Sequence, residues 1–155
     1  IGKMSFDEET MEKLAEKKNT WYVEYISKMD ESEILPGAKE FILRLRNEGV
    51  KTALGSASKN TPLILEKLGI RDLFDVVVDG NMVSKTKPDP EVFLKCAELL
   101  NVKPENCIVY EDAEAGVIAA KTAGMKCVGI GKKDVLALAD AVVEGLHEIR
   151  NGYGL

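Results

Sequence analysis

The sequence predicts an α/β fold, in which a parallel sheet is covered by helices on both faces. Short apolar strands alternate with helices along most of the chain, and polar residues directly follow several of the strands. This alternation is typical of parallel sheets. With 155 residues, 45% of them hydrophobic, the chain is long enough to build one compact domain with its own core.

The predicted elements follow one another from residue 5. Residues 5–29 read as one long, highly charged helix with a partial apolar stripe. A polar connector follows, so we expect a boundary between a small first unit, residues 1–31, and a main domain, residues 32–155. In the main domain, glycines at 49, 69 and 124 suit the left-handed residue that ends a helix. The predicted helices there cover residues 38–48, 62–68, 90–100 and 114–123, and the predicted strands cover 50–55, 75–79, 107–111, 126–130 and 141–143.

Composition excludes some classes of function. The net charge of −5 and the absence of a basic stripe argue against nucleic-acid binding, although a few local lysines could still bind an anionic small molecule. No apolar run approaches the length of a membrane span, so we expect no membrane association. The three cysteines show no metal-type or redox-type spacing, which favours reduced core residues in a cytoplasmic protein.

The first candidate site is the segment Gly55–Pro62, which follows a predicted strand. Its small residues leave backbone N–H groups accessible, its hydroxyl and amide groups can donate hydrogen bonds, and Lys59 adds a positive charge. These features suit a phosphate group. An ordinary turn with Asn60 or Thr61 capping the next helix explains the same residues, and for this segment alone that interpretation is favoured.

The second candidate site is the lysine-rich segment Ser84–Pro90. Pro88 favours an extended conformation at Lys87, and the two prolines stiffen the segment, so the Lys87 ammonium could be aimed at a fixed point. There it could hold the negative charge of a carboxylate and a phosphoryl group together. A solvated surface loop explains the segment equally well.

The third candidate site is the pair Glu111–Asp112 at the end of an apolar strand. Where the strand ends, both carboxylates can turn toward one point. Adjacent oxygen ligands suit Mg²⁺, which is held by few protein carboxylates and keeps waters and phosphate oxygens. The alternative is that Asp112 only caps the following helix.

Together and in this order, the three segments resemble motifs two, three and four of the haloacid dehalogenase superfamily. The stretches 53–60, 85–93 and 110–116 are similar to its beta-phosphoglucomutase branch in particular, and Ser-Ala-Ser-Lys-Asn at 56–60 is the most diagnostic run. Residues 15–19 resemble the end of the helical cap of that branch. The resemblance implies a Rossmann-like core preceded by the last part of a helical cap domain.

The resemblance also implies a role for each matching residue. Ser56 would hydrogen-bond the transferring phosphoryl group, and Lys87 would pair with that group and with the nucleophile. Glu111 and Asp112 would hold Mg²⁺, directly or through water. The residues expected to bind the sugar phosphate are Ala57, Ser58, Lys59 and Asn60 in the core, with Lys18 and Asn19 reaching down from the cap.

The reaction implied is the interconversion of beta-glucose 1-phosphate and glucose 6-phosphate through an aspartyl-phosphate and a bisphosphate, in a protein that is a monomer when intact. The family's nucleophile motif, Asp-x-Asp, has no counterpart in this sequence. In the family it lies on a central strand, between those that here end at Ser56 and Glu111. We therefore expect an amino-terminally truncated chain that is inactive and poorly folded alone. A phosphatase of the same superfamily and a non-catalytic phosphate-binding module remain alternatives.

Overall fold

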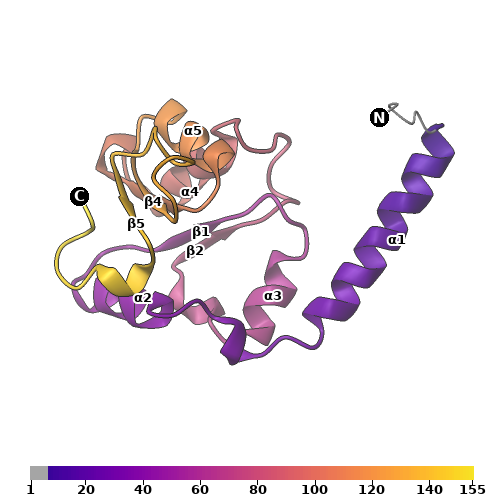
Figure 1. Ribbon diagram of the computed structural model, residues 1–155, viewed down its shortest axis with the longest axis horizontal. Helices are drawn as coiled ribbons and strands as arrows, with labels where there is room; N and C mark the ends of the chain where they lie inside the picture. Colours follow the sequence, from indigo (N-terminus) through magenta and orange to yellow (C-terminus); the bar gives the residue numbers. More distant parts are fainter. Residues whose placement is uncertain (1–6) are drawn as a thin grey trace.

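In the computed structural model, which describes residues 7–155, strands and helices alternate as predicted (Figure 1). The strands form two parallel sheets, one with the order β1–β2 and one with the order β3–β4–β5. The prediction of an α/β fold with a parallel arrangement is confirmed. The strands are β1 (Ala53–Gly55), β2 (Val76–Val78), β3 (Ile108–Glu111), β4 (Lys126–Ile130) and β5 (Ala141–Val143).

Four helices of the main domain cover the sheets. Contacts join α4 to β1 and β2, and α5 to β3 and β4, while α2 packs near the carboxyl-terminal turn. The helices are α2 (Ala38–Asn47), α3 (Thr61–Lys67), α4 (Glu91–Leu100) and α5 (Glu114–Thr122). Single turns of 3₁₀-helix lie at Glu31–Glu33, Arg71–Leu73, Pro104–Asn106 and Leu146–Glu148.

The element boundaries have local causes. Gly49, Gly69 and Gly124 all have positive φ angles, of 76°, 63° and 75°, as expected for residues that end helices. The strand β1 begins at Ala53 and is shorter than predicted, and Thr52, just before it, is bonded to a side chain. Its N–H donates to the Asp75 carboxylate over 2.7 Å, which lowers the pKa of Asp75 mainly through that backbone hydrogen bond.

One hydrophobic core connects the two sheets. It contains Val78 of β2 and Val109 of β3, together with Val92 of α4 and Val117 of α5. The helices α4 and α5 contact each other as well as the sheets. The two sheets are therefore held together by helix packing and not by hydrogen bonds between strands.

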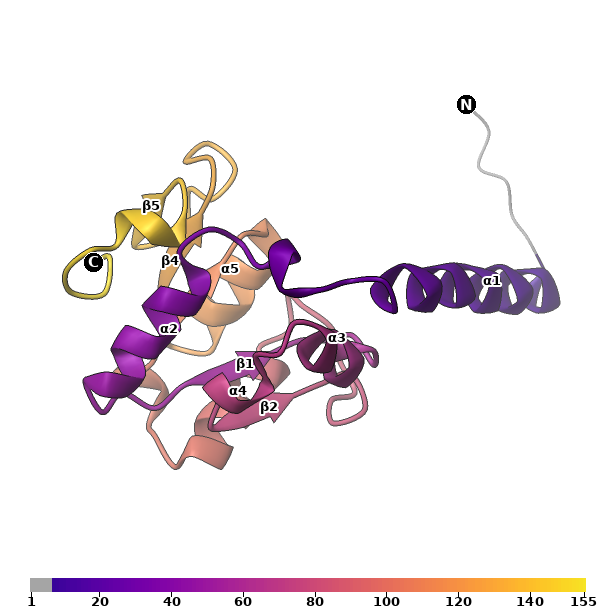
Figure 2. The same cartoon turned by 90° about the horizontal axis from the view of Figure 1, so that it is seen from below.

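The first helix, α1 (Glu8–Ile26), extends away from the rest of the molecule in both views (Figures 1 and 2). Its amino end is capped by Asp7, whose side chain accepts from the Thr10 N–H; the predicted start at residue 5 lies outside the described residues. Its carboxyl end contacts α3, where Ile26 is fully buried. Trp21 is 61% exposed, and so are most of the described side chains before it in the helix. The domain boundary at residue 31 stays a prediction.

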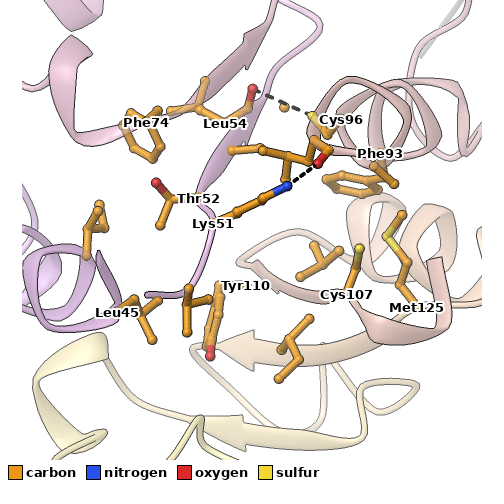
Figure 3. Close-up of a pocket in the computed structure, with 18 of the residues that line it drawn as sticks. Leu45, Lys51, Thr52, Leu54, Phe74, Phe93, Cys96, Cys107, Tyr110 and Met125 are labelled. Carbon is orange, nitrogen blue, oxygen red and sulfur yellow. Dashed lines mark hydrogen bonds between the residues drawn. The ribbon is translucent and has the colours of Figure 1, made fainter. Parts of the chain in front are cut away.

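Between the two sheets lies a cavity of about 800 Å³, which we call the slot (Figure 3). Leu54 of β1 lines it on one side, Tyr110 of β3 on another, and Cys96 of α4 closes a third. Within residues 7–155, β1 pairs only with β2 and β3 only with β4. The open edges of two parallel strands thus border one largely apolar space.

None of the helices described is both long and apolar enough to cross a membrane.

Candidate phosphate and metal site

The candidate residues gather at the carboxyl ends of β1 and β3. Ser56 directly follows β1, Glu111 is the last residue of β3, and both line the slot. Lys87, from the loop before α4, reaches Glu111 with 2.7 Å between Nζ and Oε2. Ligands of open parallel sheets bind at this edge, so the structure places three predicted residues where chemistry is expected.

The loop 56–60 is arranged to donate hydrogen bonds. The Ser56 hydroxyl accepts from the Ser58 N–H over 3.1 Å, and the Ser58 hydroxyl accepts from the Asn60 N–H over 3.2 Å. Each hydroxyl therefore keeps its own hydrogen for an external acceptor. The backbone N–H groups of Ala57 and Lys59 have no hydrogen-bond partner in the described part of the chain. These are donors of the kind that bind phosphate oxygens.

Gly80 packs closely against the backbone of this loop and donates a hydrogen bond to it. Its N–H donates to the Ser58 carbonyl over 3.1 Å, and the Thr61 hydroxyl donates to the same carbonyl over 2.8 Å. A Cβ on Gly80 would collide with the Ala57 carbonyl oxygen and would lie 2.9 Å from the backbone nitrogen of Lys59. Only glycine lets the two segments approach this closely.

A second, polar cavity of about 510 Å³ opens beside the loop. Lys59 and Lys85 both line it, so two ammonium groups border the same space. The Lys85 ammonium forms an ion pair with Asp89 over 3.2 Å. Lys59 forms no ion pair with any residue that the structure describes.

The loop that carries Lys87 is held by Glu91. Its carboxylate accepts from the backbone N–H groups of Ser84 and Lys85, at 3.1 and 2.7 Å, and these hydrogen bonds lower the pKa of Glu91. Asp89 accepts from the Glu91 N–H over 3.0 Å, so α4 begins at Glu91 and not, as predicted, at residue 90. Hydrogen bonds to Glu91 therefore tie down the start of this loop, although Ser84, Lys85 and Thr86 are exposed.

The Lys87–Glu111 pair is partly buried. The two side chains are 21% and 9% exposed, and the Lys87 ammonium also lies 4.7 Å from the centre of the Phe93 ring. A cation over an aromatic face is attracted to it. The ammonium is thus held in one place by a carboxylate on one side and an aromatic ring on another.

The metal site remains a prediction. Asp112 is exposed, and Glu111 is engaged by Lys87. Among residues 7–155 there is no cluster of three or more His, Cys, Asp or Glu side chains that could hold a metal ion. Two adjacent carboxylates at this edge fit Mg²⁺ only if other oxygens complete its octahedron, which is how Mg²⁺ is commonly bound.

Of the two predicted cap residues, one meets the loop. The Asn60 amide donates to the Asn19 side-chain oxygen of α1 over 3.0 Å. Lys18 is exposed on the same helix, and among the described residues no hydrogen bond or ion pair joins it to the loop. Gly80 and the Phe93 ring were not identified from the sequence. Gly80 acts on the loop 56–60, which is distant along the chain, whereas Phe93 is close to Lys87 in the sequence but reads as an ordinary apolar residue of a helix.

Comparisons with known proteins identify the family of this chain. The family model for haloacid dehalogenase-like hydrolases matches residues 1–124. A beta-phosphoglucomutase of Bacillus subtilis (strain 168) is 43% identical over 138 residues, which cover 89% of this chain and 61% of that protein. A validoxylamine A 7'-phosphate phosphatase of Streptomyces hygroscopicus subsp. limoneus is 44% identical over 89 residues, 56% of this chain and 42% of that protein.

The structure also resembles a crystal structure of beta-phosphoglucomutase from Clostridium difficile. The TM-score is 0.89 at 40% sequence identity, and the match covers 96% of this chain and 66% of the other. The chain thus spans less than two thirds of the length of both mutases. On the family match and the shared fold, it belongs to the haloacid dehalogenase-like hydrolase family.

Proposed function

We propose that the intact protein is a Mg²⁺-dependent sugar-phosphate mutase that interconverts beta-glucose 1-phosphate and glucose 6-phosphate. The loop 56–60, with its free donors and its hydrogen bond from Asn60 to Asn19, is the observation that carries the proposal. A mutase must bind the non-reacting phosphate of its substrate as well as the reacting one. A phosphate loop that contacts a second structural unit is suited to that task.

Some of the site residues bind the transferring phosphoryl group, and the others bind the non-reacting phosphate of the substrate. The Ser56 hydroxyl and the Lys87 ammonium act on the transferring phosphoryl group, because both lie where β1 and β3 end. Fixed donors and charges that meet developing negative charge are the main source of catalysis in phosphoryl transfer. Ala57, Ser58, Lys59 and Asn60 bind the other phosphate, and Lys18 and Asn19 close over the sugar from α1.

Glu111 and Asp112 would hold Mg²⁺, which neutralises charge on the transferring group when it is bound. Glu111 would then serve two cations, since Lys87 is already 2.7 Å from one of its oxygens.

The nucleophile is proposed to come from a strand that fills the slot. Two open parallel edges and apolar walls fit an extended segment that runs parallel to β1 and β3. The carboxyl end of such a strand would emerge between Ser56 and Glu111. A carboxylate there would attack one phosphorus of the sugar bisphosphate; the bond from phosphorus to the sugar oxygen breaks, and that oxygen takes up a proton. The resulting aspartyl-phosphate then gives its phosphoryl group to the free hydroxyl of a sugar monophosphate, which loses its proton, so that the bisphosphate forms again.

The test uses the intact protein with beta-glucose 1-phosphate, Mg²⁺ and a trace of glucose 1,6-bisphosphate. We expect glucose 6-phosphate to form much faster than inorganic phosphate. A phosphatase is the second candidate, favoured by the similarity to the Streptomyces enzyme. Steady release of inorganic phosphate without isomerisation would decide for it.

A further inference from the structure

Gly116 lies in the first turn of α5, where the backbone does not require a glycine. Its N–H donates to the Ala113 carbonyl over 3.0 Å, and its φ angle is not among the positive ones. Alanine is the better helix former in such a position. The reason for a glycine must therefore lie outside the helix.

That reason is the Glu111 side chain. A Cβ on Gly116 would collide with it, and the three nearest atoms all belong to that residue: Cδ, Cγ and Oε1. Glu111 has little freedom to withdraw, because its side chain is only 9% exposed and its other oxygen bonds to Lys87. The carboxylate is therefore confined between the helix backbone and the ammonium.

We infer that Gly116 is a positioning residue for the site. The space left by its missing side chain is the space that the Glu111 carboxylate occupies, and Glu111 in turn holds Lys87 at the ends of β1 and β3. The consequence for catalysis rests on the proposed function, whereas the placement of Glu111 does not. A methyl group at position 116 displaces the carboxylate and loosens the ion pair.

The first experiment measures unfolding of the intact protein in urea, in two backgrounds. With glutamate at 111, Gly116→Ala should raise the unfolding equilibrium constant at least about tenfold, as overpacking does. In the Glu111→Asp background, where the side chain is one methylene shorter, the same change should be neutral or stabilising. The matched control, Thr122→Gly at the other end of α5, should destabilise both backgrounds equally. Equal destabilisation of both backgrounds by Gly116→Ala would overturn the inference.

The second experiment measures the ion pair itself by a double-mutant cycle with Lys87→Met and Glu111→Gln. With Gly116 present, the coupling between Lys87 and Glu111 should change the unfolding equilibrium constant about fivefold or more. With the Gly116→Ala change, this coupling should vanish. In the mutase assay, Gly116→Ala should lower kcat at least about tenfold and change KM little. A coupling that survives Gly116→Ala overturns the inference and leaves the proposed function intact. If the protein does not isomerise the sugar phosphate, the proposed function fails while the coupling still decides the inference.

Discussion

The replacement Gly80→Ala should damage phosphate binding without removing any group that binds phosphate. The new Cβ would clash with the Ala57 carbonyl oxygen and lie too close to the Lys59 backbone nitrogen. The loop 56–60 must therefore move by roughly 1 Å to reach ordinary contact distance. Displacing backbone in this way costs about 1–3 kcal/mol, and the hydrogen bond from Gly80 to Ser58 contributes about 1 kcal/mol more. We expect the intact protein to lose about 2–4 kcal/mol in its free energy of unfolding.

The larger effect is on the ligand. A hydrogen bond to a charged acceptor is worth about 1.5–3 kcal/mol, so misaligning one loop donor should weaken binding about 10- to 150-fold. Calorimetric titration of the intact protein with inorganic phosphate, in excess Mg²⁺, measures this directly. Met82→Ala is the control, since Met82 is 40% exposed and only two residues away. If folded Gly80→Ala binds phosphate as tightly as the parent, the loop is not the phosphate site.

Three further changes test the site and its support. Lys59→Ala should weaken sugar-phosphate binding more than it slows formation of the phospho-enzyme; an equal loss in rapid-quench and binding assays would refute the assigned role. Lys121 and the Cys127 N–H donate to the Asp140 carboxylate and lower its pKa. The ionised carboxylate therefore stabilises the fold fully above pH ~4–5, and this stabilisation is lost as the pH falls through the pKa of Asp140 in the folded protein. Asp140→Asn should therefore cost about 1–2 kcal/mol in the free energy of unfolding at pH 7, and urea melts should show the difference from the parent shrinking below pH ~4. Burial raises the pKa of the Cys96 thiol to about 11. Alkylation of Cys96 at pH 8, followed by mass spectrometry, should therefore be on the order of a hundredfold slower than alkylation of a free thiol. An equal rate would show that Cys96 is not buried.

The elements of the fold were largely predictable from the sequence. The strands at 126–130 and 141–143 have the predicted bounds, because parallel strands read as short, largely continuous apolar runs. The helix ends at three glycines also agree, since a left-handed residue is a local requirement. The position of Ser56 and Glu111 at strand ends followed from the same local patterns.

The contacts that make these residues a site were not predictable in this way. Lys87 and Glu111 are 24 residues apart, and Asn60 lies 41 residues from Asn19. The sequence by itself determined which residue types follow each strand. Only the tertiary structure decided that Lys87 pairs with Glu111, and that Gly80 and Gly116 make room for the loop and the carboxylate. The physical reason is that periodicity and capping depend on neighbours along the chain, whereas these contacts depend on how helices pack distant segments together.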